Sequence, residues 1–250
     1  ICMVKGLDTF WKYFADYEEQ YVLIGGAACD ILFESNEVNF RATRDLDMVL
    51  IVEALTPEFG EKFWKFIVDG KYRNKATNGS NPQFYRFDKP EDDNFPKMIE
   101  LFCRSDFKLK YAKGITPIHI DDEVSSLSAI LLNDDYYKAL LNGKEVRKGL
   151  SVLRPEYIIL FKAKAYLDLK KQKDLGEKVD SSDIKKHKKD ILRIASELML
   201  EKVEELPIAV DADIHSFIDL LEQEPFDQNS LKRFGLKNED VVEVLKQVFG

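Results

Sequence analysis

This 250-residue chain contains only three cysteines, three histidines and two tryptophans. Cys2, Cys29 and Cys103 are odd in number and far apart, a spacing that suits neither a disulfide framework nor a zinc site, so we expect reduced cysteines. The tryptophans, Trp11 and Trp64, are expected in the core. The chain also has no Gly-Lys-Ser/Thr phosphate loop and no serine-nucleophile elbow, which excludes two common classes of active site.

Long apolar runs are absent too. No run reaches the roughly 18 residues that a bilayer requires, so we expect no membrane-spanning segment. The first residues, 1–5, have neither the basic start nor the apolar core of a secretory signal, and we expect a cytoplasmic protein. Hydrophobic residues make up 45% and charged residues 33% of the chain, as is typical of an ordered globular protein.

The net charge of −8 is unevenly spread along the chain. Residues 197–250 hold 13 acidic and 5 basic residues, which accounts for the whole excess. Basic residues concentrate between positions 162 and 189. This distribution argues against a protein that wraps duplex nucleic acid, but it is compatible with a local anion site.

Hydrophobic periodicity divides the chain near residue 153. Before it, apolar runs predict strands over 21–24, 45–52, 83–87 and 97–103, the last two joined as a hairpin, with shorter strands around 118 and 128–132. Helices are predicted over 7–20, 27–35 and 57–68. After it, the pattern predicts helices over 155–171, 183–199, 213–222 and 238–249. We therefore expect an α+β fold, with a mixed β-sheet and flanking helices in residues 1–153 and a helical domain in residues 154–250.

Asp45 and Asp47 begin one predicted strand. Because side chains alternate along a strand, both carboxylates share one face, about 7 Å apart. Their mutual repulsion is relieved by a nearby cation, and hard oxygen ligands suit Mg²⁺ or Mn²⁺. The alternative is a solvated strand end.

Glu100 and the Gly25-Gly26 pair are two further candidates. Glu100 lies in an otherwise apolar strand, where a lone buried carboxylate is costly; it either pairs with Arg86 across the hairpin or serves as a third acidic ligand. Gly25 and Gly26 follow a strand and open a helix, where backbone amides can bind phosphate. The alternative there is an ordinary tight turn.

Two lysines fall on apolar faces of the predicted helices. Lys162 needs an anion, either an acidic side chain or a ligand phosphate, unless its ammonium reaches solvent. Lys188 falls in a stripe formed by Ile184, Ala195, Leu198 and Met199, with His187 and Asp190 beside it. The alternative for this second segment is a solvated charged face.

Several of these segments together carry a resemblance. The segments are Gly25-Gly26-Ala27, the run from Arg41 through Thr43 to Asp47, and Ile99-Glu100-Leu101. Together they resemble the polymerase-β-type nucleotidyltransferase superfamily. Within it, the chain is most similar to the AbiEii-type family of type IV toxin–antitoxin and phage-defence systems, whose later motifs resemble 162–165 and 187–190. The resemblance implies that Asp45, Asp47 and Glu100 are the catalytic, metal-binding carboxylates. It also implies substrate contacts from Gly25, Gly26, Arg41, Thr43, Lys162, His187, Lys188 and Asp190.

The activity implied by this resemblance is transfer of a nucleoside monophosphate from a nucleoside triphosphate to a hydroxyl group, with Mg²⁺ or Mn²⁺ bound. The acceptor would be an RNA end, a protein or a small molecule, and an antitoxin would be the partner. Two alternatives stay open. One is a catalytically silent nucleotide-binding module; the other is a toxin or antitoxin component that acts by occlusion through its acidic C-terminal helices.

Overall fold

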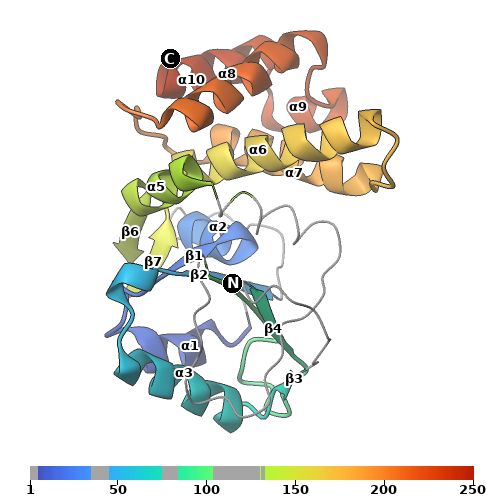
Figure 1. Ribbon diagram of the computed structural model, residues 1–250. Helices are drawn as coiled ribbons and strands as arrows, with labels where there is room; N and C mark the ends of the chain where they lie inside the picture. Colours follow the sequence, from blue (N-terminus) through green and yellow to red (C-terminus); the bar gives the residue numbers. More distant parts are fainter. Residues whose placement is uncertain (1–4, 35–44, 75–83, 104–129, 131–132) are drawn as a thin grey trace. The chain divides into compact units, whose positions relative to one another are not determined.

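A computed structural model describes residues 5–34, 45–74, 84–103, 130 and 133–250 (Figure 1). Two predicted substrate contacts, Arg41 and Thr43, lie outside these residues, as do the expected strand around 118 and all of 128–132 except Ile130. The chain divides into two compact units. Of the described residues, the first unit holds those up to 103 together with 144–154, and the second holds 130, 133–143 and 155–250.

Within its described residues, the first unit is built on a mixed sheet of seven strands. Its order is β3-β4-β5-β2-β1-β7-β6; the β1–β7 and β2–β5 pairs are parallel, and the other neighbours are antiparallel. This confirms the α+β class and the predicted β4–β5 hairpin. The strands are β1 (Tyr21–Ile24), β2 (Asp45–Leu50), β3 (Arg73–Asn74), β4 (Phe84–Asp88), β5 (Met98–Cys103), β6 (Lys144–Arg147) and β7 (Leu150–Leu153).

Helices cover both faces of this sheet. Figure 1 shows α1 (Leu7–Phe14) and α3 (Pro57–Asp69) on one face and α2 (Gly25–Glu34) on the other. The short 3₁₀ helix η1 (Val52–Ala54) leads into α3. Rings fill the space between α1, α3 and the sheet, with the centroids of Phe10 and Phe14 4.5 Å apart. Phe14 and Phe66 meet edge to face at 5.3 Å, a favourable arrangement for aromatic quadrupoles.

The helix predicted over 7–20 is shorter than expected and ends at Phe14. The Phe14 carbonyl accepts a hydrogen bond from the Tyr17 amide at 3.0 Å and from the Tyr21 hydroxyl at 3.4 Å. These contacts turn the chain into β1 and end the helix. Trp11, expected in the core, is 45% exposed, so that expectation is wrong.

In the second unit, every regular element that the structure describes is a helix. Its helix α6 packs against both α7 and α8, and α8 packs against α10. Within the described residues, no helix combines the length and apolarity that a membrane crossing needs. The helices are α5 (Asp134–Asn142), α6 (Pro155–Asp174), α7 (Ser181–Glu197), α8 (Ile208–Gln223), α9 (Gln228–Phe234) and α10 (Asn238–Phe249).

Several bounds of this unit differ from the prediction, including the start of α8, which was predicted at 213 and lies at Ile208. Helix α5 lies in the range 1–153 that was expected for the first domain, although it belongs to the helical unit. Helix α9 was not expected at all. Helix α7 ends at Glu197 because Leu198 adopts an extended conformation (φ −113°, ψ 147°), so Met199, expected in an apolar stripe, is 91% exposed.

Candidate active site

The two aspartates of β2 lie at its N-terminal end. Asp45 and Asp47 are half-buried, whereas Leu46 and Met48, on the opposite face of the strand, are fully buried. The alternation places both carboxylates on one face of the sheet, as the spacing predicted. Leu46 pairs with Ile99 and Ile99 with Phe87, whose ring contacts Phe63 of α3. The aspartates therefore face the side of the sheet that α2 covers.

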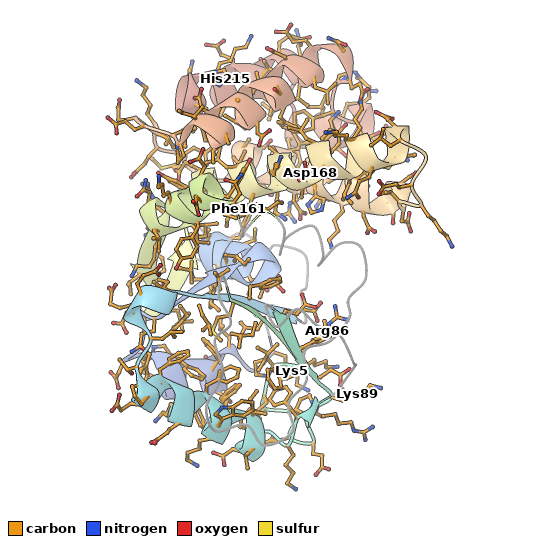
Figure 2. All side chains as sticks on the ribbon, viewed as in Figure 1. Lys5, Arg86, Lys89, Phe161, Asp168 and His215 are labelled. Atoms are coloured by element: carbon orange, nitrogen blue, oxygen red, sulfur yellow. The ribbon has the colours of Figure 1, made fainter. Side chains whose placement is uncertain are left out.

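A single row of paired residues crosses the sheet at Asp47. Asp47 is paired with Glu100 of the parallel strand β5, and Glu100 is paired with Arg86 of β4, which Figure 2 labels. On the other side, Asp47 is paired with Ile24, the last residue of β1. Residues paired directly across a sheet project from the same face, so Asp47, Glu100 and Arg86 become neighbours.

Glu100 is the buried member of this row, with 7% of its surface exposed. Its Oε1 atom accepts from Arg86 Nε at 2.9 Å and lies 2.7 Å from Arg86 Nη2. A hydrogen bond also joins its carboxyl group to Asp47, and the charge of Asp45 acts on it as well. Burial raises the pKa of Glu100, and Arg86 opposes that rise. The predicted ion pair with Arg86 is thus observed, and so is the meeting with the aspartates.

Gly25 brings the start of α2 against the carboxylate of Asp47. Its φ of +61° lies in the left-handed region, and a Cβ at this position would stand 2.3 Å from Asp47 Oδ2. The helix begins at Gly25, directly after β1 and two residues earlier than predicted, and Gly26 is buried in its first turn. Because the N-terminus of a helix carries partial positive charge, it favours an anion at this point.

Asp45 and Asp47 fit a hard cation by the chemistry of their donors. Within the described ranges, no three side chains of His, Cys, Asp or Glu come close enough to complete a metal site. Mg²⁺, however, is commonly held by one or two carboxylates, with substrate phosphates and water supplying the remaining oxygens. A two-carboxylate set with Glu100 held by Arg86 therefore matches a site that a nucleotide would complete. The two-ion, three-carboxylate arrangement remains a prediction.

Lys162 and Asp190, both predicted substrate contacts, bind each other in the helical unit. Lys162 Nζ on α6 lies 2.7 Å from Asp190 Oδ2 on α7. The two residues are only 8% and 3% exposed. Of the anions that the sequence allowed for Lys162, the structure supplies an acidic side chain, and the lysine is buried.

Lys188 is held by carbonyls and rings. Its ammonium donates to the carbonyl oxygens of Glu224 and Pro225 and lies 5.6 Å from the ring centroid of Tyr166 and 5.5 Å from that of Phe226. Burial lowers the pKa of Lys188, against the opposing effect of Glu224. These contacts tie α7 to the segment that follows α8. His187 lies half-buried on the same helix.

Tyr166 and Phe226 were not among the residues that the sequence singled out. Tyr166 lies one turn after Lys162 on α6, and Phe226 is distant from both in the chain. Only the packing of the helices brings these two rings to Lys188, so no local pattern could have indicated them.

The comparisons with known proteins are distant. No protein-family model matches this chain, and no curated protein matches it either. Among solved structures, it is similar to the crystal structure of an antigenic nucleotidyltransferase-like protein from Paracoccidioides brasiliensis, with 16% identity over 97% of this chain and 93% of that chain and a TM-score of 0.49. Similarity of this degree assigns neither a family nor an activity to the chain.

Proposed function

We propose that this protein is a metal-dependent nucleotidyltransferase that moves a nucleoside monophosphate from a nucleoside triphosphate to a hydroxyl acceptor. One observation carries the proposal: the carboxyl group of Asp47 meets Glu100 on one side and the helix start at Gly25 on the other. Acidic oxygens and free helix amides are the two kinds of group that a metal-bound triphosphate needs.

Asp45 and Asp47 would hold the cation, Mg²⁺ or Mn²⁺. When bound, such an ion neutralises the charge on the phosphates and polarises the phosphorus–oxygen bonds. The protein's own contribution is to place the triphosphate beside Gly25 and Gly26, with the α-phosphate in line with the acceptor hydroxyl.

The proposed step is a substitution at the α-phosphorus. The acceptor oxygen forms a bond to the α-phosphorus, the bond from that phosphorus to the oxygen it shares with the β-phosphorus breaks, and pyrophosphate leaves. The proton of the acceptor hydroxyl needs a base nearby. We assign to Glu100 the role of orienting that hydroxyl or taking its proton, because its carboxyl group lies next to Asp47 and burial raises its pKa.

The acceptor is an RNA end, a protein hydroxyl or a small molecule, and we place the activity in a toxin-like component with an antitoxin partner. This part of the proposal follows the resemblance of Arg41–Asp47 and of 187–190. Its test is expression in the source cell: the wild type should arrest growth, and the Asp47→Asn variant should not. Equal growth arrest by the wild type and by Asp47→Asn would argue against a catalytic toxin.

Transfer itself is tested with α-labelled triphosphates. Each of the four is incubated with the protein, Mg²⁺ and a lysate, and label is followed into RNA, protein and small molecules. We expect label in one fraction, its loss with EDTA, and a fall of at least about 100-fold for Asp47→Asn. The matched control is Asp8→Asn, an exposed carboxylate on α1. Equal transfer by Asp47→Asn and wild type would refute the proposed roles.

The alternative function, a nucleotide-binding module without transfer activity, is favoured by the Arg86–Glu100 ion pair, since Arg86 neutralises Glu100 without any metal. Calorimetry separates the two. A silent module would bind triphosphate equally well with and without Mg²⁺ and transfer no label, whereas the transferase requires the ion for both.

A further inference from the structure

A cavity of about 510 Å³ opens in the helical unit, between α6, α7 and the segment that joins α8 to α9. Three lysines on one face of α7 (Lys185, Lys188 and Lys189) line it, and Lys173 reaches it from α6. The apolar part of its wall is formed by Ile184, Leu192 and Phe226. All of its lining residues belong to the helical unit, whereas the candidate active site belongs to the first unit.

The acidic groups of this cavity are already engaged. Glu224 accepts from Tyr166 at 3.2 Å and from Lys170, and both contacts help keep its pKa low. Asp227 caps α9 through the amide and hydroxyl of Ser230, each at 2.9 Å. Glu224 is therefore paired mainly with Lys170, whereas Asp227 keeps its charge in the cap but forms no ion pair with a lysine of the cavity among the residues that the structure describes.

Two of the lysines are engaged as well, and two are not. Lys188 is held by its carbonyls and rings, and Lys173 donates to Ser181 Oγ at 2.6 Å. Lys185 and Lys189 are exposed and form no hydrogen bond or ion pair with any residue that the structure describes; Lys189 acts on Asp227 only through its charge. They stand four positions apart on α7, where like charges repel. A shared anion relieves that repulsion.

We infer that this cavity binds a phosphate-bearing planar ring, the chemistry of a mononucleotide. The phosphate would lie between Lys185 and Lys189, and the ring would lie against Ile184 and Leu192. Two hydroxyl groups that line the cavity keep some capacity for a sugar: Ser181 Oγ, which accepts from Lys173, can still donate its proton, and Ser230 Oγ, which donates to Asp227, can still accept. A volume of about 510 Å³ lies within the range of small-molecule sites. The inference does not rest on the proposed function, since it uses none of the carboxylates of the first unit.

The test uses the full chain carrying Asp45→Asn and Asp47→Asn, with EDTA, so that binding at the candidate active site does not contribute. Calorimetry follows titration with AMP, GMP, CMP and UMP, and with adenosine and inorganic phosphate as half-ligands. The same titrations are repeated on Lys185→Gln/Lys189→Gln. The matched control is Lys171→Gln/Lys178→Gln, which removes equal charge from exposed positions outside the cavity.

We expect at least one mononucleotide to bind saturably and more tightly than either half-ligand. The Lys185/Lys189 pair of substitutions should weaken this binding about tenfold or more, and the control pair should leave it within about twofold. A 5′-phosphorylated oligonucleotide forms the second arm: tighter binding than the matching mononucleotide identifies a strand end as the source, and equal or weaker binding identifies the free nucleotide. No saturable binding at millimolar ligand, equal weakening by both pairs, or inorganic phosphate binding as tightly as the nucleotides would each overturn the inference.

Discussion

At Gly25 the backbone takes a conformation that glycine adopts without strain and brings a helix start within contact of a carboxylate. The left-handed φ of +61° would by itself disfavour most side chains, and Asp47 Oδ2 closes the space where a Cβ would stand. Gly25, which the sequence indicates as part of a Gly-Gly pair and as a phosphate contact, thus lets the helix start approach the proposed metal ligand.

Gly25→Ala should cost more stability than an alanine at an open left-handed glycine. Gly235 is the matched control, with φ +67° and nothing within 4 Å of its Cβ position. Both variants carry the conformational strain, but only Gly25→Ala must move Asp47, so we expect it to unfold about 1–3 kcal/mol more easily than Gly235→Ala. Urea denaturation measures the difference, and equal costs would contradict the close approach.

Arg86→Gln should destabilise the protein by about 2 kcal/mol or more near neutral pH, because it leaves the buried carboxylate of Glu100 without its cation. The folded protein holds the Glu100 proton to a higher pH than the unfolded chain does, where the pKa is about 4.3. Stability is therefore lost as the pH rises from that value through the raised pKa, and removing Arg86 enlarges the loss.

The measurement for this variant is urea unfolding near pH 4 and near pH 7. The cost of Arg86→Gln should be small at the lower pH, where Glu100 is protonated and neutral, and large at the higher one. Arg73→Gln, at an exposed position on β3, is the control and should cost little at either pH. A cost for Arg86→Gln that does not change with pH would show that the ion pair is not what the substitution removes.

At the scale of elements, α6 and α7 are joined by a buried ion pair. Lys162→Met alone deprives the buried Asp190 carboxylate of this ammonium, and Asp190→Leu alone deprives the buried Lys162 ammonium of this carboxylate. We expect each single variant to lose about 3–5 kcal/mol and the Lys162→Met/Asp190→Leu double variant to lose clearly less than the sum. A double-mutant cycle in urea measures this, and strict additivity would contradict a direct pair.

Elements with a strong local pattern were predictable, and those that depend on distant partners were not. The helix over 238–249 was predicted with its observed bounds, because apolar residues recur on one face throughout. Helix α5 was missed, although Asn133 caps it and two aspartates follow in its first turn. With only nine residues, the helix is too short for its hydrophobic period to stand out in the sequence. The β6–β7 hairpin was missed because Lys148 and Gly149, both at positive φ, form its turn with little else to mark it.

At the scale of the whole molecule, ligand binding should raise the stability of the first unit. A ligand present at a hundred times its dissociation constant stabilises the folded state by about 2.7 kcal/mol. We expect Mg²⁺ with a triphosphate to raise the melting temperature of wild type, EDTA to reverse this, and the Asp45→Asn/Asp47→Asn variant to show no Mg²⁺-dependent rise. Differential scanning calorimetry checks this, and an equal rise in that variant would place the Mg²⁺-dependent ligand elsewhere.

By itself the sequence determined that Asp45 and Asp47 share a face, that a glycine pair joins a strand to a helix, and that Glu100 and Lys162 need a partner of opposite charge, because these follow from the period of a strand or helix and from the cost of a buried charge. The sequence offered Arg86 as one possible partner of Glu100, but only the tertiary structure decided which partners these groups have. The parallel register of β2 with β5 sets Asp47 beside Glu100, and helix packing sets Lys162 against Asp190. Pairing between segments far apart in the chain depends on the whole set of contacts, which no local pattern encodes.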